Sequence, residues 1–395
     1  MSYSIQSKIF FFLLSAFTAS LIIFDLSVNV IYSNILNIIL FIFFGISFLM
    51  NKDLKFQINN FILIYFFFTA FSLSSIFWAV DFDLAFIYSM RLVVVSLNLF
   101  IIYTIITYYK IQNAILYGIL IGAFFNYLLA FNIIHVNYDL YEFGRFIGSE
   151  GNSNKLSKIM LLSIFASLVL LSFEKTNKVF KVYLIISILL SLYVIFLTVS
   201  KKAIILAPLL LLASISFQNI NIKKIFIFFI IIAIAIKIFF TFVDFSSIDK
   251  AIDVFHRRFQ GFLNMLEGKQ GDDSSNERIY LLKEGFVIFQ DSPIFGTGLN
   301  NFRVFLGKYA HNNYLELLVD VGFIGTLLFY GIYVILFQGV TKMHNIVLRK
   351  YIFIMIIILL LMDIATVSYY NKLVLLILLY IFFMIKQNQE MDAYE

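Results

Sequence analysis

The sequence of 395 residues contains no cysteine, two prolines, four histidines and 13% charged residues. The absence of cysteine excludes disulfide bonds and thiolate catalysis. The histidines, His135, His256, His311 and His344, are scattered and lack the spacing of metal ligands, so we expect neither a metal nor a cofactor. The scarcity of charge, together with 62% hydrophobic residues, excludes an ordinary soluble domain.

The hydrophobic residues form runs that are long enough to cross a membrane as helices, which takes about 20 residues. The short alternating segments typical of a transmembrane barrel are absent. We therefore predict an all-α, polytopic integral membrane protein with one large external helical loop. The first run is interpreted as an uncleaved span rather than a signal peptide, because many spans follow it. The twelve predicted spans are 8–24, 34–50, 59–79, 84–107, 113–134, 156–173, 181–199, 203–217, 222–243, 311–340, 350–367 and 371–386.

The charges of the short connections alternate along the chain. One set of connections carries lysine or arginine, whereas 25–33 and 80–83 carry only acidic charge. The positive-inside rule then places the first set and both termini in the cytoplasm. The chain divides into transmembrane helices 1–5 (1–134), helices 6–9 with the external loop 135–155 (135–243), a large periplasmic loop (244–310), and helices 10–12 with a cytoplasmic tail (311–395).

Cations on the external side break this charge rule. Arg145, Lys201 and Arg278 all lie in predicted external segments, which suggests that they bind an anion there. The large loop also has helical hydrophobic periodicity, in 248–266 and in 277–290. We predict an amphipathic helix in each of these two segments, the first at the membrane surface.

The segment 309–325, YAHNNYLELLVDVGFIG, leads from the large loop into a predicted span. It begins with polar residues and carries Glu316 and Asp320 one turn apart on one helix face. Ionisable groups that enter a bilayer cost several kcal/mol, so they are functional candidates by default.

These motifs resemble the shared C-terminal domain of the O-antigen ligase and O-antigen polymerase family. The family pattern is Arg, a helix, Pro-x-x-Gly-x-Gly, a gap, and His-Asn-x-x-Leu-Glu followed by Gly-x-x-Gly. The sequence supplies Arg278, DSPIFGTGLNNF and AHNNYLELLVDVGFIG in this order. GRFIGSEGNSN at 144–154 and LTVSKKAIIL at 197–206 are similar to further family segments. Where the family usually has Ser-Arg this chain has Lys201, which binds phosphate as a point charge without a bidentate fork.

The resemblance implies a metal-independent glycosyltransferase on a helical fold of the C type, in the bacterial cytoplasmic (inner) membrane with its active site facing the periplasm. The implied donor is a glycan on polyprenyl diphosphate. The implied acceptor is another lipid-linked repeat unit for a polymerase, or the lipid A core for a ligase. The other expected partners are membrane lipids and a chain-length regulator, and the net charge of +6 is not read as affinity for nucleic acid.

Cleavage of the bond between the sugar and the lipid diphosphate builds negative charge, which cations must stabilise where no metal motif is present. We expect Arg145, Lys201 and Arg278 to bind the donor diphosphate, with Arg278 also catalytic. His311 is the second catalytic candidate because the unperturbed pKa of histidine lies near neutrality. It would act either as a base for the acceptor hydroxyl or as a cation on the diphosphate.

Three further residues are candidates for orienting the substrate: Asn312, Glu316 and Arg91. Asn312 also fits a helix cap, Glu316 a carboxylate favoured by the helix dipole, and Arg91 an ion pair within the membrane. The close fit to both family motifs favours a polymerase over a ligase. A lipid-linked glycan flippase or other transporter is the alternative from another class, but the ionisable residues concentrate at the outer edge rather than along a path through the membrane.

Overall fold

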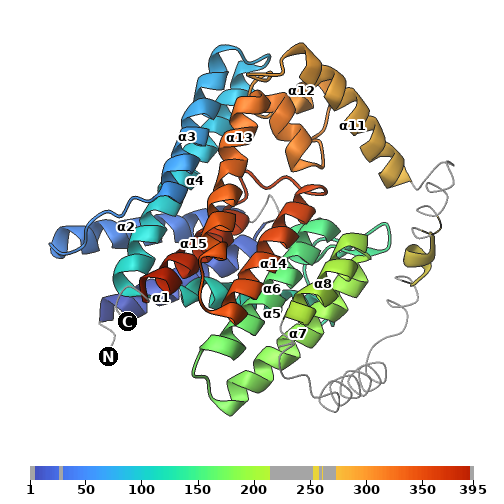
Figure 1. The fold of residues 1–395 in the computed structure, drawn as a ribbon. Helices are drawn as coiled ribbons and strands as arrows, with labels where there is room; N and C mark the ends of the chain where they lie inside the picture. The colour runs from blue at the N-terminus through green and yellow to red at the C-terminus, as the bar shows by residue number, and fades with distance from the viewer. Residues whose placement is uncertain (1–4, 26–29, 214–251, 258–259, 261–272, 392–395) are drawn as a thin grey trace.

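The fold is that of a computed structural model, which describes residues 5–25, 30–213, 252–257, 260 and 273–391. Its regular structure there is helical, apart from one hairpin of two-residue strands, β1 (Tyr141–Glu142) and β2 (Arg145–Phe146). Figure 1 shows the long helices packed together, with α11 and α12 beside one end of α13. The predicted all-α polytopic fold is confirmed.

Nine of the described helices are long and apolar enough to cross a membrane. They are α1 (Ile5–Ile23), α2 (Val30–Met50), α3 (Asn60–Ser74) with its 3-10 extension η1 (Ser75–Phe77), α4 (Phe82–Tyr109), α5 (Asn113–Ala130), α6 (Ser153–Phe173), α7 (Lys178–Thr198), α13 (Asn313–Thr341) and α15 (Lys372–Met391). Two more helices match predicted spans, α8 (Lys201–Ala213) and α14 (Ile346–Asp363).

Two predicted helices fall wholly or mostly outside the described part of the chain, namely the span 222–243 and the loop helix 248–266. The second loop helix, predicted over 277–290, is confirmed as α11 (Asp273–Asp291). The four-part division of the chain stays a prediction.

Polar side chains determine where many of the helices begin. The side chain of the preceding residue accepts a hydrogen bond from a backbone N–H of the first turn, which satisfies a donor that the helix itself leaves unpaired. The residues that cap helices in this way are Asn59, Asp81, Asn152, Asn177, Asn312 and Asn345. These caps explain why the hydrophobic runs start as helices directly after short polar turns.

Several connections that are distant in sequence meet at one end of the helices. Lys155 forms an ion pair of 2.9 Å with Asp25, and the Nε1–H of Trp78 donates to the carbonyl of Phe295 over 3.2 Å. We call this end, which comprises 24–25, 75–81, 131–153, 198–200, 291–312 and 364–371, the loop end. The segments that meet at the loop end agree with the connections that the alternation of charge places on the external side. The position of the loop end at the periplasmic face stays a prediction.

Small residues bring α1 and α5 close together near the loop end. A Cβ atom added to Gly118 would lie 2.5 Å from the Cβ of Thr18, and one added to Gly122 would lie 2.7 Å from the Cβ of Ile22. Backbones that approach this closely are typical of helix pairs in membranes. The contact fixes the end of α1 that carries Asp25.

Candidate functional site at the loop end

Helix α13 is interrupted at Gly322, whose backbone has φ +63° and ψ −166°. The turn 293–298 fills the interruption, and the N–H of Thr297 donates to the carbonyl of Val319 over 2.8 Å. A Cβ on Gly322 would lie 2.3 Å from the carbonyl oxygen of Ile294, so only glycine fits there. The element that Gly322 admits beside α13 is therefore a turn.

Asp320, just before this interruption, anchors the short helix α12 (Phe302–Leu306). Its carboxylate accepts hydrogen bonds from the N–H of Asn300 at 2.7 Å and of Phe302 at 2.8 Å. All three residues are fully buried. The carboxylate therefore fixes the start of the helix that carries Arg303.

Helix α11 packs against α12 and the start of α13 through a small core of its own. Gly285 permits this contact, since an added Cβ would lie 2.8 Å from the side chains of both Leu315 and Phe302. Arg278 lies seven residues before Gly285, and residues seven apart lie on one side of a helix. The buried residues of this core are Leu281, Phe302, Ala310, Leu315 and Val319.

His311 lies immediately before α13, with a left-handed backbone at φ +53°. The Oε2 of Glu316 accepts a hydrogen bond from the N–H of Ala310 over 2.8 Å, which fixes the chain on one side of His311. On the other side, the Oδ1 of Asn312 caps α13 by accepting from the N–H groups of residues 314 and 315. Asn312 and Glu316 therefore both hold the turn that presents His311.

The charges around His311 come from two neighbouring helices. Arg278 and Glu277 belong to α11, Arg303 belongs to α12, and Lys308 follows α12 and forms an ion pair with Glu277. Burial, followed by the positive charge of Arg278, lowers the pKa of His311 to about 4. The imidazole is therefore neutral at neutral pH and can accept a proton.

Arg303 is a residue of this cluster that the sequence analysis did not select. Its guanidinium carbon lies 5.4 Å from the ring centroid of Tyr309 and 5.5 Å from that of Tyr88. The Tyr309 ring is in turn 3.9 Å from the ring of His311. The only signal in the sequence was the position of Arg303 between two family motifs, in a loop that contains many other cations.

The other two predicted phosphate ligands lie in the loop end or directly beside it: Arg145 belongs to β2, and Lys201 begins α8. The Nε–H of Arg145 donates to the carbonyl of Thr198 over 2.9 Å, and its Nη2 lies 3.5 Å from the Oδ1 of Asn154. The same Oδ1 accepts from Ser200, directly before Lys201 in the first turn of α8.

Lys202, the residue after Lys201, connects the surroundings of Arg145 to α11. The positive charges of Lys202 and Arg278 interact, so the start of α8 lies near α11. The predicted ligands Arg145, Lys201 and Arg278 thus lie on elements that meet at the loop end.

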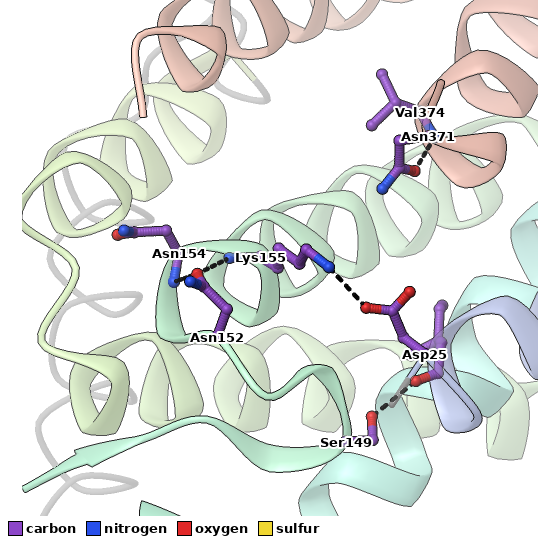
Figure 2. A network of polar contacts seen from close by, with 8 residues as sticks. Asp25, Ser149, Asn152, Asn154, Lys155, Asn371 and Val374 are labelled. Atoms are coloured by element: carbon purple, nitrogen blue, oxygen red, sulfur yellow. Dashed lines mark hydrogen bonds and ion pairs between the residues drawn. The ribbon is translucent and has the colours of Figure 1, made fainter. Parts of the chain in front are cut away.

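Arg91 does not join this group and lines a separate cavity of about 890 Å³ instead. Walls of the cavity come from α1, α2, α4, η2 (Gly148–Glu150), α6 and residues 367–374. Figure 2 shows Lys155 of α6 reaching across to Asp25 at the end of α1. Beside this ion pair, burial and then the charge of Asp25 raise the pKa of Glu150 well above its ordinary value.

No group of three or more histidine, aspartate or glutamate side chains that could hold a metal ion occurs among the residues that the structure describes. The cluster around His311 offers cations, an imidazole, tyrosine rings and the carboxylate of Glu277, which is paired with Lys308. Such a set can bind a phosphate and accept a proton.

Residues 186–330 match the family model described as O-antigen ligase. This match confirms the resemblance and includes α8, α11, α12 and the start of α13. It indicates activity of the type shared by O-antigen ligases and polymerases, which is glycan transfer, in a multi-pass bacterial membrane protein. Arg91, Arg145 and the cavity residues of α1, α2 and α6 lie outside the matched range. A comparison with curated proteins found no match.

Proposed function

We propose that the protein is a polymerase of bacterial surface polysaccharide. It transfers a glycan from a polyprenyl diphosphate to a sugar hydroxyl of another lipid-linked repeat unit, at the periplasmic face of the cytoplasmic membrane. The observation that carries the proposal is the position of His311 directly before α13, beside Arg278 of α11 and Arg303 of α12. A base next to several cations suits a reaction that deprotonates a hydroxyl while a diphosphate departs.

In the proposed reaction, a nitrogen of His311 accepts the proton of the acceptor hydroxyl. The hydroxyl oxygen forms a bond to the anomeric carbon of the donor, and the bond from that carbon to the phosphate oxygen breaks with its electron pair on the phosphate. Arg278, Lys201 and Arg145 stabilise the diphosphate that leaves. The imidazolium then loses its proton to water, which restores the base.

We assign His311 the role of base because its imidazole is neutral at pH 7 and can accept a proton. An imidazole with a pKa of about 4 carries no charge at pH 7, so it adds little to phosphate binding before substrate arrives. Arg278 and Arg303 remain charged and can supply that binding. Glu316 and Asn312 act as positioning residues, because both hold the backbone next to His311.

An O-antigen ligase, with the lipid A core as acceptor, is the second candidate. The description of the matching family model favours it, whereas the close fit to both sequence motifs favours the polymerase. The two enzymes would use the donor in the same way and differ only in their acceptor.

Deletion of the gene, followed by electrophoresis of the surface glycan, tests both candidates. A lipid A core bearing a single repeat unit would support the polymerase, and a bare core with long chains retained on polyprenyl diphosphate would support the ligase. Complementation with His311→Ala should fail, whereas the matched control His344→Ala should restore the wild-type ladder, because His344 is exposed and lies beyond the other end of α13. A normal ladder with His311→Ala at wild-type protein levels would remove His311 from the chemistry.

A further inference from the structure

The cavity beside Arg91 combines three chemical surfaces that no step of the proposed reaction uses. Cationic side chains, polar acceptor atoms and apolar side chains all line the same 890 Å³. The cations are Arg91, Lys155, Lys158 and Lys372. Together the three surfaces suit a ligand that has an anionic head group, polar groups and an apolar part.

Two of the cations are held in place by the fold. Lys158 is only 5% exposed, whereas Lys155 is half-buried and is fixed by its ion pair with Asp25. Asp25 offsets part of the positive charge. Burial together with the charge of Asp25 raises the pKa of Glu150, which favours the neutral form of Glu150. The cavity therefore keeps a net positive charge, which suits the double negative charge of a diphosphate diester.

Two buried oxygen atoms on the cavity wall lack a hydrogen-bond partner in the described part of the chain. They are the Oδ1 of Asn37 and the Oε1 of Glu150. Buried acceptors are normally paired, because leaving one unpaired costs about 1–3 kcal/mol. Both atoms would be satisfied by hydroxyl groups, such as those of a sugar.

Apolar side chains form another part of the lining. Ile38 of α2 and Ile87, Met90 and Val94 of α4 line the cavity and are also exposed. Exposed apolar side chains favour contact with hydrocarbon over contact with water. This side of the cavity, which α2 and α4 form, therefore suits the lipid chain of a ligand that stays in the membrane.

We propose that this cavity binds the diphosphate and the first sugar of a second polyprenyl-linked glycan, the acceptor, while its lipid chain lies against α2 and α4. This inference rests on the proposed polymerase function, since only a polymerase joins two such lipids. The hydroxyl that attacks lies on a distal sugar of the acceptor, so the acceptor diphosphate must be bound away from the reacting carbon.

The position of the cavity relative to His311 supports this assignment. Tyr370 lines the cavity, and its ring centroid lies 5.9 Å from that of Tyr88. Both Arg91, from the cavity, and Arg303, from the cluster around His311, approach the Tyr88 ring. The two cationic sites thus share one tyrosine as their boundary.

The charges of the two sites also fit different roles. A leaving diphosphate gains negative charge in the reaction. It therefore needs cations whose charge is little offset by nearby carboxylates, as beside His311. An acceptor diphosphate keeps its charge throughout, so partial compensation by Asp25 does not slow the reaction.

Native mass spectrometry of the full-length protein with undecaprenyl diphosphate tests the inference by counting bound lipids. We expect two molecules on the wild type, one on Arg91→Gln, one on Arg278→Gln and none on the double variant. Loss of one charge-assisted contact should weaken the affected site at least about tenfold. Arg91→Lys should keep two molecules, and Val94→Trp, which fills the apolar side of the cavity without removing a cation, should keep one.

A wild type that binds a single molecule, lost in Arg278→Gln and kept in Arg91→Gln, would overturn the inference and leave the donor site intact. Displacement of the molecule that depends on Arg91 by an equal concentration of phosphatidylglycerol would also overturn it, because the cavity would then be an ordinary head-group site. If Arg278→Gln changes nothing while Arg91→Gln removes one molecule, the cavity site stands and the proposed donor site fails. Each variant is compared only if it elutes as a single species of wild-type size.

Discussion

Replacing Gly322 by alanine should release the turn 293–298 from α13. The backbone of Gly322 occupies a region that is nearly exclusive to glycine, and placing alanine there costs about 1–3 kcal/mol. The new Cβ would also lie 2.3 Å from the carbonyl oxygen of Ile294 and 2.6 Å from the N atom of Gly296. Both neighbours are backbone atoms, so relieving the clash costs a further 1–3 kcal/mol or so.

With the unfolding entropy per residue of globular proteins, the expected loss of about 2–6 kcal/mol corresponds to a fall in melting temperature of roughly 2–7 °C. Gly331→Ala is the matched control in the same helix. Its Cβ would meet Ile64 at 3.7 Å, an ordinary contact, and alanine is the better helix former by about 1 kcal/mol. This control should melt at or slightly above the wild-type temperature.

The single tryptophan makes the measurement specific. Trp78 donates a hydrogen bond to Phe295 within the turn, so its fluorescence reports whether the turn stays in place. We expect a changed emission maximum and loss of glycan transfer in Gly322→Ala, with neither change in Gly331→Ala. Equal melting temperatures and emission spectra for Gly322→Ala and the wild type would refute the reasoning.

Three further predictions concern the cluster around His311. The ring of His311 is partly buried, and the charges of Arg278, Arg303 and Lys308 outweigh that of Glu277, so its pKa is lowered to about 4. His311 should therefore stay neutral, and transfer by the purified enzyme should persist as pH falls from 7 to about 5. A kcat/KM profile that breaks near pH 6.5 would contradict this. The same depressed pKa means that the unfolded chain takes up the proton first, so thermal stability should decline as pH falls from about 6.5 toward 4, and less steeply in His311→Gln. Asp320→Asn should leave one buried backbone N–H unpaired and lower the free energy of unfolding by about 1–3 kcal/mol. The control Asp291→Asn, at an exposed site, should change this free energy by less than about 0.5 kcal/mol. Equal losses in both variants would show that Asp320 does not anchor α12.

The membrane helices and most of their boundaries follow from local sequence. Long apolar runs must become helices in lipid, and the asparagine or aspartate before several of them marks the first turn. The motifs at 293–298 and 311–316 also pointed to the family whose model matches residues 186–330, because glycine positions and a histidine before a helix are visible in the order of residues. The sequence predicted that Arg145, Lys201 and Arg278 serve one site. In the structure they lie on elements that meet at the loop end, and their role in binding stays a proposal.

Tertiary structure decided what these local signals could not. The pairing of Asp25 with Lys155 joins residues that are 130 positions apart, and no periodicity along the chain predicts it. In the sequence, nothing separated Arg303 from the many other cations of its loop, and only the anchoring of α12 by Asp320 places it near His311. Arg91 lines the cavity because α1, α2, α4 and α6 pack around it. The low pKa of His311 and the cavity beside Arg91 depend on burial and on charges from several helices, which exist only once those helices have packed together.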